Sequence, residues 1–210
     1  MTGMDISELL EKANQKMKVG RYEQVLEFYD QVLATEPSNM TALTNKGKAY
    51  YYLGRHEDAI IWYDRALSVN PANAPVLYEK GYTLRKVERY EDAIRSFDRA
   101  LEIDPDFLFA LSNKGYALNA LAKYEDAIDC FDHVLKISPN NIRAMTAKAI
   151  ALRGMGKNEE AIAYFDCALA FNPINAFIWH NKAIALRNLG RTREADDCLR
   201  MANYQVGSTP

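Results

Sequence analysis

The sequence predicts an all-α protein, an α-solenoid of six antiparallel helix-turn-helix repeats. The first observation is that five of the seven prolines, Pro37, Pro71, Pro105, Pro139 and Pro173, are each separated from the next by 34 residues. A fixed period of this length indicates an array of small repeated units. The second observation is that further columns align without a gap when Pro37 is numbered position 32. The repeats are then 6–39, 40–73, 74–107, 108–141, 142–175 and 176–209.

Each repeat is expected to begin with a helix, near residues 6–19 in the first repeat and again every 34 residues. An asparagine stands just before four of these helices, where its side chain can cap the helix, and Phe107 departs from this pattern. Position 8 is small throughout, which allows another helix to approach closely. The cap column holds Asn39, Asn73, Asn141 and Asn175, and position 8 holds Ala13, Gly47, Gly81, Gly115, Ala149 and Ala183.

A turn and a second helix, near residues 22–35 in the first repeat, complete each hairpin. Position 15 of the turn is glycine in four repeats, as suits a left-handed residue that ends a helix, whereas Glu88 and Ala122 are exceptions. Positions 20, 24 and 27 fall on one face of the second helix and combine small residues with one large side chain. Position 24 holds Tyr29, Tyr63, Phe97, Phe131, Phe165 and Leu199, and position 20 holds Val25, Ala59, Ala93, Ala127, Ala161 and Ala195.

These columns resemble the tetratricopeptide repeat, whose pattern has small residues at positions 8, 20 and 27, an aromatic residue at 24 and proline at 32. The resemblance covers nearly the whole chain and implies a right-handed superhelix. One departure is systematic, because position 7, usually leucine in that family, is lysine in all six repeats. These residues are Lys12, Lys46, Lys80, Lys114, Lys148 and Lys182.

The lysine column is matched by aspartate at position 25 of the first five repeats, and Arg200 replaces aspartate in the last. Pairing within a repeat would place Lys182 against Arg200, so we favour pairing between neighbouring repeats. The expected pairs are Asp30 with Lys46, Asp64 with Lys80, Asp98 with Lys114, Asp132 with Lys148 and Asp166 with Lys182.

We expect a lead at residues 1–5, a single array at 6–203 and a flexible tail at 204–210. An end repeat needs a polar outer face, and the sixth repeat supplies one. Asp196 and Asn203 replace the apolar residues of positions 21 and 28. The last hairpin is therefore expected to serve as the cap.

Composition and motifs favour a binding protein over an enzyme. A net charge of -2 gives no general attraction to nucleic acid or membranes. No catalytic, cofactor or repeated metal-ligand motif occurs, and Cys130 with His133 lacks the further ligands that a metal site needs. The odd set of Cys130, Cys167 and Cys198 argues against a disulfide framework. Together with the absence of a signal peptide or membrane segment, this predicts a cytoplasmic protein.

Positions 2, 5, 9, 12 and 13 line the concave surface in the family that the repeats resemble. Here these thirty positions hold seven basic residues, seven aromatic residues and no aspartate or glutamate, although random placement of 28 acidic residues in 210 would give about four. Arginine and aromatic residues are enriched where binding energy concentrates. The expected groove consists of Lys48, Tyr51, Tyr78, Tyr82, Arg85, Phe109, Tyr116, Asn119, Arg143, Arg153, Phe177, His180 and Arg187.

The groove predicts an adaptor that accepts an acidic and apolar segment, helical or extended, from another protein. It does not match the clamp with which some relatives bind chaperone tails, because Leu10, Pro75 and Glu79 stand where that clamp has basic residues. Two alternatives stay open. Stacking of bases on tyrosine and pairing of phosphates with arginine would suit single-stranded nucleic acid, and repeats that stack across chains would suit a self-assembling scaffold.

Overall fold

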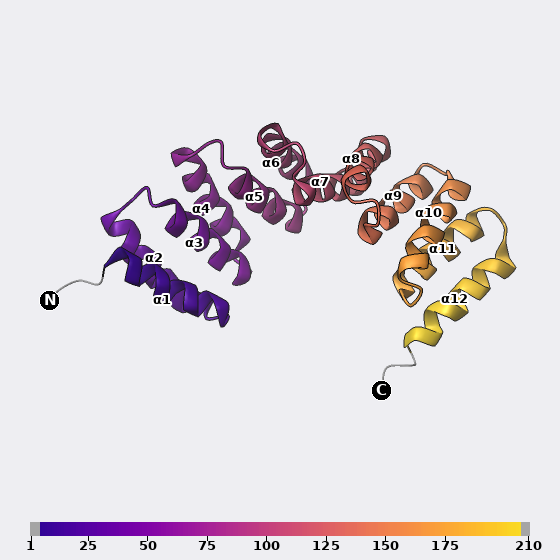
Figure 1. Cartoon of the computed structure of the whole chain (residues 1–210), viewed down its shortest axis with the longest axis horizontal. Helices are drawn as coiled ribbons and strands as arrows, with labels where there is room; N and C mark the ends of the chain where they lie inside the picture. Colours follow the sequence, from indigo (N-terminus) through magenta and orange to yellow (C-terminus); the bar gives the residue numbers. More distant parts are fainter. Residues whose placement is uncertain (1–4, 207–210) are drawn as a thin grey trace. The chain divides into compact units, whose positions relative to one another are not determined.

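The computed structural model describes residues 5–206 and, over these residues, contains twelve α-helices and no strand (Figure 1). The helices confirm the predicted pairs with the predicted period. They are α1 (Ile6–Lys18), α2 (Tyr22–Thr35), α3 (Met40–Tyr52), α4 (His56–Val69), α5 (Ala74–Lys86), α6 (Tyr90–Ile103), α7 (Leu108–Ala120), α8 (Tyr124–Ile137), α9 (Ile142–Gly154), α10 (Asn158–Phe171), α11 (Ala176–Asn188) and α12 (Thr192–Val206). The right-handed superhelix stays a prediction.

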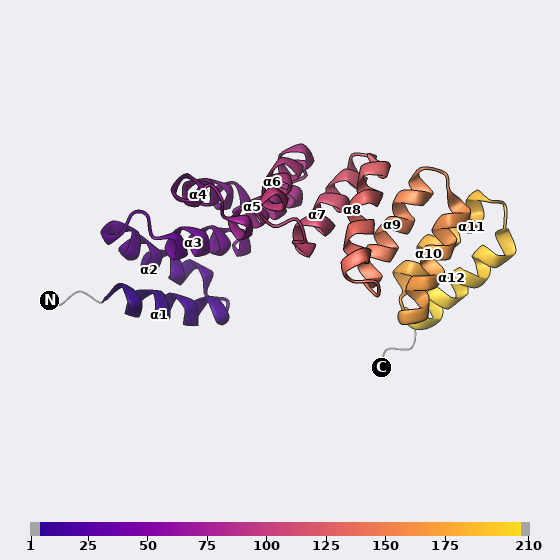
Figure 2. The same ribbon diagram turned by 45° about the horizontal axis from the view of Figure 1, so that its top comes forward.

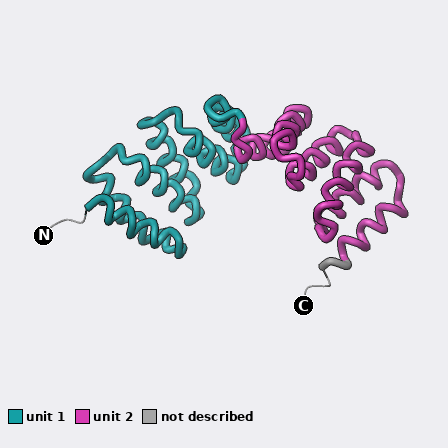
Figure 3. Tube along the Cα trace, viewed as in Figure 1, with its two compact units in different colours: residues 1–105 teal, residues 106–210 magenta. Residues whose placement is uncertain are grey.

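The helices belong to two compact units, residues 1–105 and 106–210 (Figure 3). Unit 1 contains α1 to α6 and unit 2 contains α7 to α12. Within each unit every helix packs on the next one along the chain, as the ribbons show from a second direction in Figure 2. The first helices of neighbouring repeats also contact one another, α3 with α5 in unit 1, and α9 with α7 and α11 in unit 2. We call the face that these first helices form the inner surface of each unit.

The recurring columns form the core. The ring of position 24 is completely buried in the first five repeats, and the small residues of positions 20 and 27 are buried beside it. Position 8 is small because this ring lies against it. A Cβ atom added to Gly81 would lie 2.7 Å from Cε1 of Phe97, closer than van der Waals contact allows. The columns defined from the proline spacing are therefore the positions that pack against one another in the core.

The ends of the helices follow the expected chemistry. The side chains of Asn39, Asn73, Asn141 and Asn175 each accept a backbone N–H from the first turn of the following helix, whereas Phe107 offers no such cap. At position 15, the exceptions Glu88 and Ala122 have φ angles of 62° and 56°, the same left-handed conformation as the four glycines. The position imposes this backbone conformation whether or not glycine occupies it.

The lysine column pairs between repeats, as predicted. Lys80 Nζ lies 2.5 Å from Asp64 Oδ1, and Lys182 Nζ lies 2.5 Å from Asp166 Oδ1. The same contact joins Lys46 to Asp30 and Lys148 to Asp132. The pair of Asp98 and Lys114 would join the two units and stays a prediction. Lys12, which has no preceding repeat, pairs with Glu8 on its own helix at 2.8 Å.

The last hairpin has an exposed polar face. Asp196 and Asn203 of α12 are exposed, whereas Leu26, Ile60 and Ile162, which occupy the position of Asp196 in earlier repeats, are buried. Helix α12 runs to Val206, so the first three residues of the expected tail are helical, and 207–210 lie outside the described residues, as do 1–4 of the lead. The single array and the role of this hairpin as a cap stay predictions.

Candidate functional site

All thirteen residues of the expected groove lie on first helices, and they divide between the two units. Unit 1 carries five of them on α3 and α5, and unit 2 carries eight on α7, α9 and α11. Each set is a surface of its own unit. Those of unit 1 are Lys48, Tyr51, Tyr78, Tyr82 and Arg85, and those of unit 2 are Phe109, Tyr116, Asn119, Arg143, Arg153, Phe177, His180 and Arg187.

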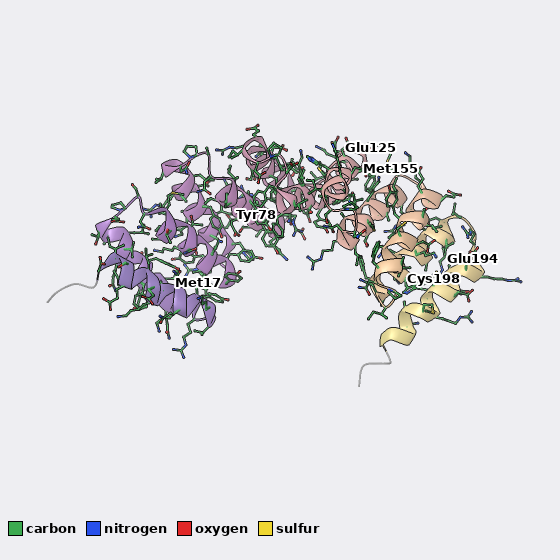
Figure 4. All side chains as sticks on the ribbon, in the orientation of Figure 1. Met17, Tyr78, Glu125, Met155, Glu194 and Cys198 are labelled. Atoms are coloured by element: carbon green, nitrogen blue, oxygen red, sulfur yellow. The ribbon has the colours of Figure 1, made fainter. Side chains whose placement is uncertain are left out.

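In unit 1 the rings form a continuous group, which we call the tyrosine cluster: Tyr22, Tyr51, Tyr52, Tyr78 and Tyr82. The centroid of Tyr82 lies 5.7 Å from that of Tyr51 and 5.9 Å from that of Tyr78, which is labelled on α5 in Figure 4. Tyr52 stacks on Tyr22 at 4.8 Å. The expected groove omitted Tyr22, because Tyr22 begins a second helix and the pattern of first helices does not include it. Tyr52 stands at position 13, one of the groove columns, but was not among the residues singled out.

Charges in unit 1 are more balanced than the sequence pattern suggests. Lys48 Nζ lies 2.9 Å from Oε1 of Glu79, a carboxylate at position 6 that the five groove columns do not contain. The guanidinium carbon of Arg85 lies 5.3 Å from the ring centroid of Tyr82, and Nζ of Lys86 lies 5.6 Å from it. Burial raises the pKa of Tyr78 to about 12, and the charge of Glu79 adds to this effect, so its phenol ionises only at a higher pH than an exposed tyrosine.

Unit 2 contains an apolar pocket of about 300 Å³ between first helices. Three residues of the expected groove line it, namely Tyr116, Arg143 and Phe177. The rest of its wall was not expected: Thr146 and Ile150 stand at positions 5 and 9, two of the groove columns, but were not singled out, and the other residues belong to columns outside the groove pattern. The complete lining is Tyr116, Ile142, Arg143, Thr146, Ala147, Ile150, Asn175, Phe177 and Ile178.

Two polar side chains in the pocket wall, Thr146 and Asn175, form hydrogen bonds within the chain. The hydroxyl of Thr146 donates to the carbonyl of Ile142 at 2.8 Å, which leaves its methyl group for the pocket. The side-chain oxygen of Asn175 accepts the N–H groups of Phe177 and Ile178 as the cap of α11. The wall therefore presents mainly hydrocarbon, with the phenol of Tyr116 and one charged group, Arg143.

The three arginines that the expected groove has in unit 2 differ in what they can reach. Arg187 pairs with Asp196 of α12 at 3.2 Å. Arg153 is half-buried, burial lowers the pKa of its guanidinium, and its Nε is buried without a partner in the described part of the chain. Arg143 is exposed and, among the residues that the structure describes, pairs with no carboxylate. Of these three arginines, Arg143 is thus the exposed one that no carboxylate of the described residues neutralises.

The other predicted residues of unit 2 lie outside the pocket. Phe109 and His180 are exposed on α7 and α11. Phe109 contacts Phe107 edge to face at 6.3 Å between centroids. Asn119 donates to the carbonyl of Ala147 at 3.2 Å, while its Oδ1 is buried and has no partner within residues 5–206.

Within the described residues no group of three metal-binding side chains occurs. Cys130 and His133, the pair considered from sequence, do not act together, because Nε2 of His133 lies 2.9 Å from Oδ1 of Asp106 while Cys130 is buried. No helix in this part of the chain is long and apolar enough to cross a membrane.

Family models described as tetratricopeptide repeat match residues 41–73, 74–107 and 106–174. A comparison with curated proteins finds no match. A tetratricopeptide repeat protein from Parabacteroides merdae superimposes with a TM-score of 0.87 at 23% identity, over 99% of this chain and 82% of that one. MamA from Desulfovibrio magneticus gives 0.78 at 19% identity, over 81% and 96%. YrrB, described as having an unusual peptide-binding site, gives 0.76 at 24% identity, over 85% and 92%. These structures show the same fold.

Proposed function

Because the chain belongs to the tetratricopeptide repeat family, we propose that it is an adaptor that holds an acidic and apolar segment of another protein on its inner surface. Members of this family are generally non-catalytic, which favours binding over catalysis. The description of YrrB names a peptide-binding site in a protein of this fold. The inner surface is the proposed site in this chain as well.

The observation that carries this proposal is the apolar pocket of unit 2 with the exposed Arg143 at its edge. Buried aromatic and apolar anchors supply most of the energy of a protein interface, and charges at the rim orient the partner and hasten association. Phe177, on the pocket wall, is 60% exposed. A ring that is this exposed beside a hydrocarbon wall gains from being covered by a partner.

The tyrosine cluster of unit 1 supports a protein ligand more than a single-stranded nucleic acid. Nucleic-acid bases need free ring faces on which to stack. In the cluster, Tyr52 stacks on Tyr22, and Arg85 and Lys86 lie over Tyr82. The pairing of Lys48 with Glu79 also removes a cation that a phosphate would require.

The cysteines support a reducing compartment, and we propose the cytoplasm. All three are free, and Cys167 is exposed on α10. An exposed free thiol is compatible with the cytosol, where thiols are kept reduced, more than with an oxidising compartment.

Site-specific photo-crosslinking in the source cells tests the proposed function. A benzophenone amino acid replaces Phe177, and a matched control carries it at Ile61 of α4, because the two side chains are 60% and 57% exposed. We expect peptides of another protein to crosslink at position 177 and not at position 61. Crosslinks to RNA at position 177 would establish the nucleic-acid alternative, and crosslinks to a second copy of the chain would establish self-assembly.

A further inference from the structure

We infer that the pocket of unit 2 recognises a two-part signal, one large apolar side chain with a carboxylate beside it in the same segment, and that Arg143 determines this specificity. The inference rests on the proposed function and adds the chemical identity of the ligand. The ligand is a protein segment in which leucine, isoleucine, methionine or phenylalanine neighbours aspartate or glutamate.

The size of the pocket fits a side chain. Its volume of about 300 Å³ is at the lower end of the roughly 300–1,000 Å³ found for small-molecule sites. Ile142 and Ile150 of α9 and Ile178 of α11 form its aliphatic wall, and Tyr116 and Phe177 contribute rings. An apolar side chain that enters this space exchanges water for contact with several hydrocarbon groups, which favours binding in proportion to the area covered.

The wall discriminates against polar side chains. The hydroxyl of Thr146 is engaged by the carbonyl of Ile142, and the side-chain oxygen of Asn175 is engaged by two backbone N–H groups of α11. A serine or asparagine side chain of the ligand would lose its hydrogen bonds to water on entering the pocket. It would not gain equivalent hydrogen bonds to the wall. An unsatisfied buried polar group costs about 1–3 kcal/mol, so the pocket selects apolar residues.

The charge at the edge of the pocket supplies the second part of the signal. Arg143 lines the pocket, is exposed and lacks a carboxylate partner among the described residues. Lys48 and Arg187 instead pair with Glu79 and Asp196. A guanidinium can donate two parallel hydrogen bonds to the oxygens of one carboxylate, and Arg143 can therefore pair with an acidic residue next to the buried apolar one.

Selection of peptides from a phage-displayed random library tests this assignment. The immobilised full chain is compared with three variants: Arg143→Glu, Ile150→Trp, which fills the pocket from its half-buried wall, and Arg187→Glu, which makes the same change of charge at an arginine that is already paired. Circular dichroism confirms the fold of each variant. Arg143 is exposed, so its replacement leaves the core intact even where Ile150→Trp fails to fold.

We expect the wild-type chain to enrich peptides with an apolar residue beside aspartate or glutamate. Arg143→Glu should enrich lysine or arginine at that place and weaken binding of the wild-type peptides about fivefold or more. Ile150→Trp should remove the apolar preference, and Arg187→Glu should preserve both preferences. If the wild-type chain enriches peptides whose sequences do not change with Arg143→Glu, the inference is wrong although the adaptor function stands. If no peptide is enriched, both the inference and the binding of peptide segments are contradicted.

Discussion

Lys80 Nζ lies 2.5 Å from Oδ1 of Asp64, sixteen residues earlier and in the preceding repeat. The equivalent pair in the first two repeats differs in burial, because the side chain of Lys46 is 4% exposed whereas that of Lys80 is 22% exposed. Nζ of Lys46 also lies 3.9 Å from the ring centroid of Trp62. One charge pattern thus produces contacts of unequal burial.

This difference in burial predicts unequal effects of removing the aspartate. Asp30→Asn should lower the free energy of unfolding by about 1–3 kcal/mol, because a hydrogen bond to the nearly buried ammonium of Lys46 is weakened. Asp64→Asn should lower it by about 0–1 kcal/mol, as for exposed pairs. Urea unfolding of both variants measures the difference. Equal losses would show that the burial of the lysine does not matter.

The left-handed backbone at Ala122 predicts a stabilising substitution. An L-residue in this conformation costs about 1–2 kcal/mol, which glycine avoids apart from its greater entropy in the unfolded chain. Ala122→Gly should therefore raise the free energy of unfolding by about 0.5–1 kcal/mol. Ala120→Gly is the control. Ala120 is the last residue of α7, so glycine there should lower the free energy of unfolding. A loss of stability in Ala122→Gly would contradict the strain that its φ of 56° implies.

The buried phenol of Tyr29 predicts an alkaline loss of stability. Burial raises its pKa from 10.0 to about 12. Both states hold the proton below pH 10, and between pH 10 and 12 the unfolded chain releases it while the native chain keeps it. The free energy of unfolding should therefore fall as the pH rises through this window, by about 1–3 kcal/mol.

Tyr29→Phe isolates this contribution, since phenylalanine occupies the same position in the third, fourth and fifth repeats. The hydroxyl of Tyr29 is buried near Asn45 but makes no hydrogen bond of ordinary geometry in the described residues, so we expect the variant to keep its stability at pH 7. Above pH 10 the free energy of unfolding of the variant should decline less steeply than that of the wild-type chain, as urea unfolding at each pH would measure. Parallel curves for the two proteins would show that Tyr29 ionises as freely in the native state as in the unfolded chain.

Arg143 and Arg187, the exposed arginines of the expected groove in unit 2, predict different effects on association. Arg143→Gln should slow the binding of a peptide selected on the wild-type chain, and the effect should shrink as salt screens the charge over about 8–10 Å. Arg187→Gln changes the net charge by the same amount but removes a cation that Asp196 already neutralises. Stopped-flow fluorescence at several salt concentrations compares them. An equal effect of both variants would indicate general attraction instead of a local contact.

The fold could be predicted from the sequence because the packing repeats with the same period as the chain. Pro37 and its equivalents define the boundaries of the repeats. The ring of Phe97 lies against Gly81, which explains why position 8 is always a small residue. The turn residues Glu88 and Ala122 were exceptions in sequence and are regular in structure. The backbone at that position is set by the neighbouring helices, which residue identity alone does not reveal.

The site was predictable only in part. Tyr116, Arg143 and Phe177 were expected and line one pocket, but Ile142 and Ile178 belong to columns that look like ordinary core. Sequence also assigned Lys48 and Arg187 to the ligand, whereas Glu79 and Asp196 neutralise them from positions outside the chosen columns. Such pairings depend on side-chain directions across helices, which one-dimensional spacing does not determine.

The central claim is that unit 2 holds a partner's segment in its apolar pocket, and methyl NMR of the isoleucine-labelled full chain tests it most directly. A peptide selected on the wild-type chain is added while the signals of Ile142, Ile150 and Ile178, which line the pocket, are followed. The buried Ile60 and the exposed Ile61 of α4 serve as controls. We predict saturable shifts of the three pocket methyl groups and unchanged controls. Binding of the peptide that leaves the pocket methyl groups unshifted would contradict the account.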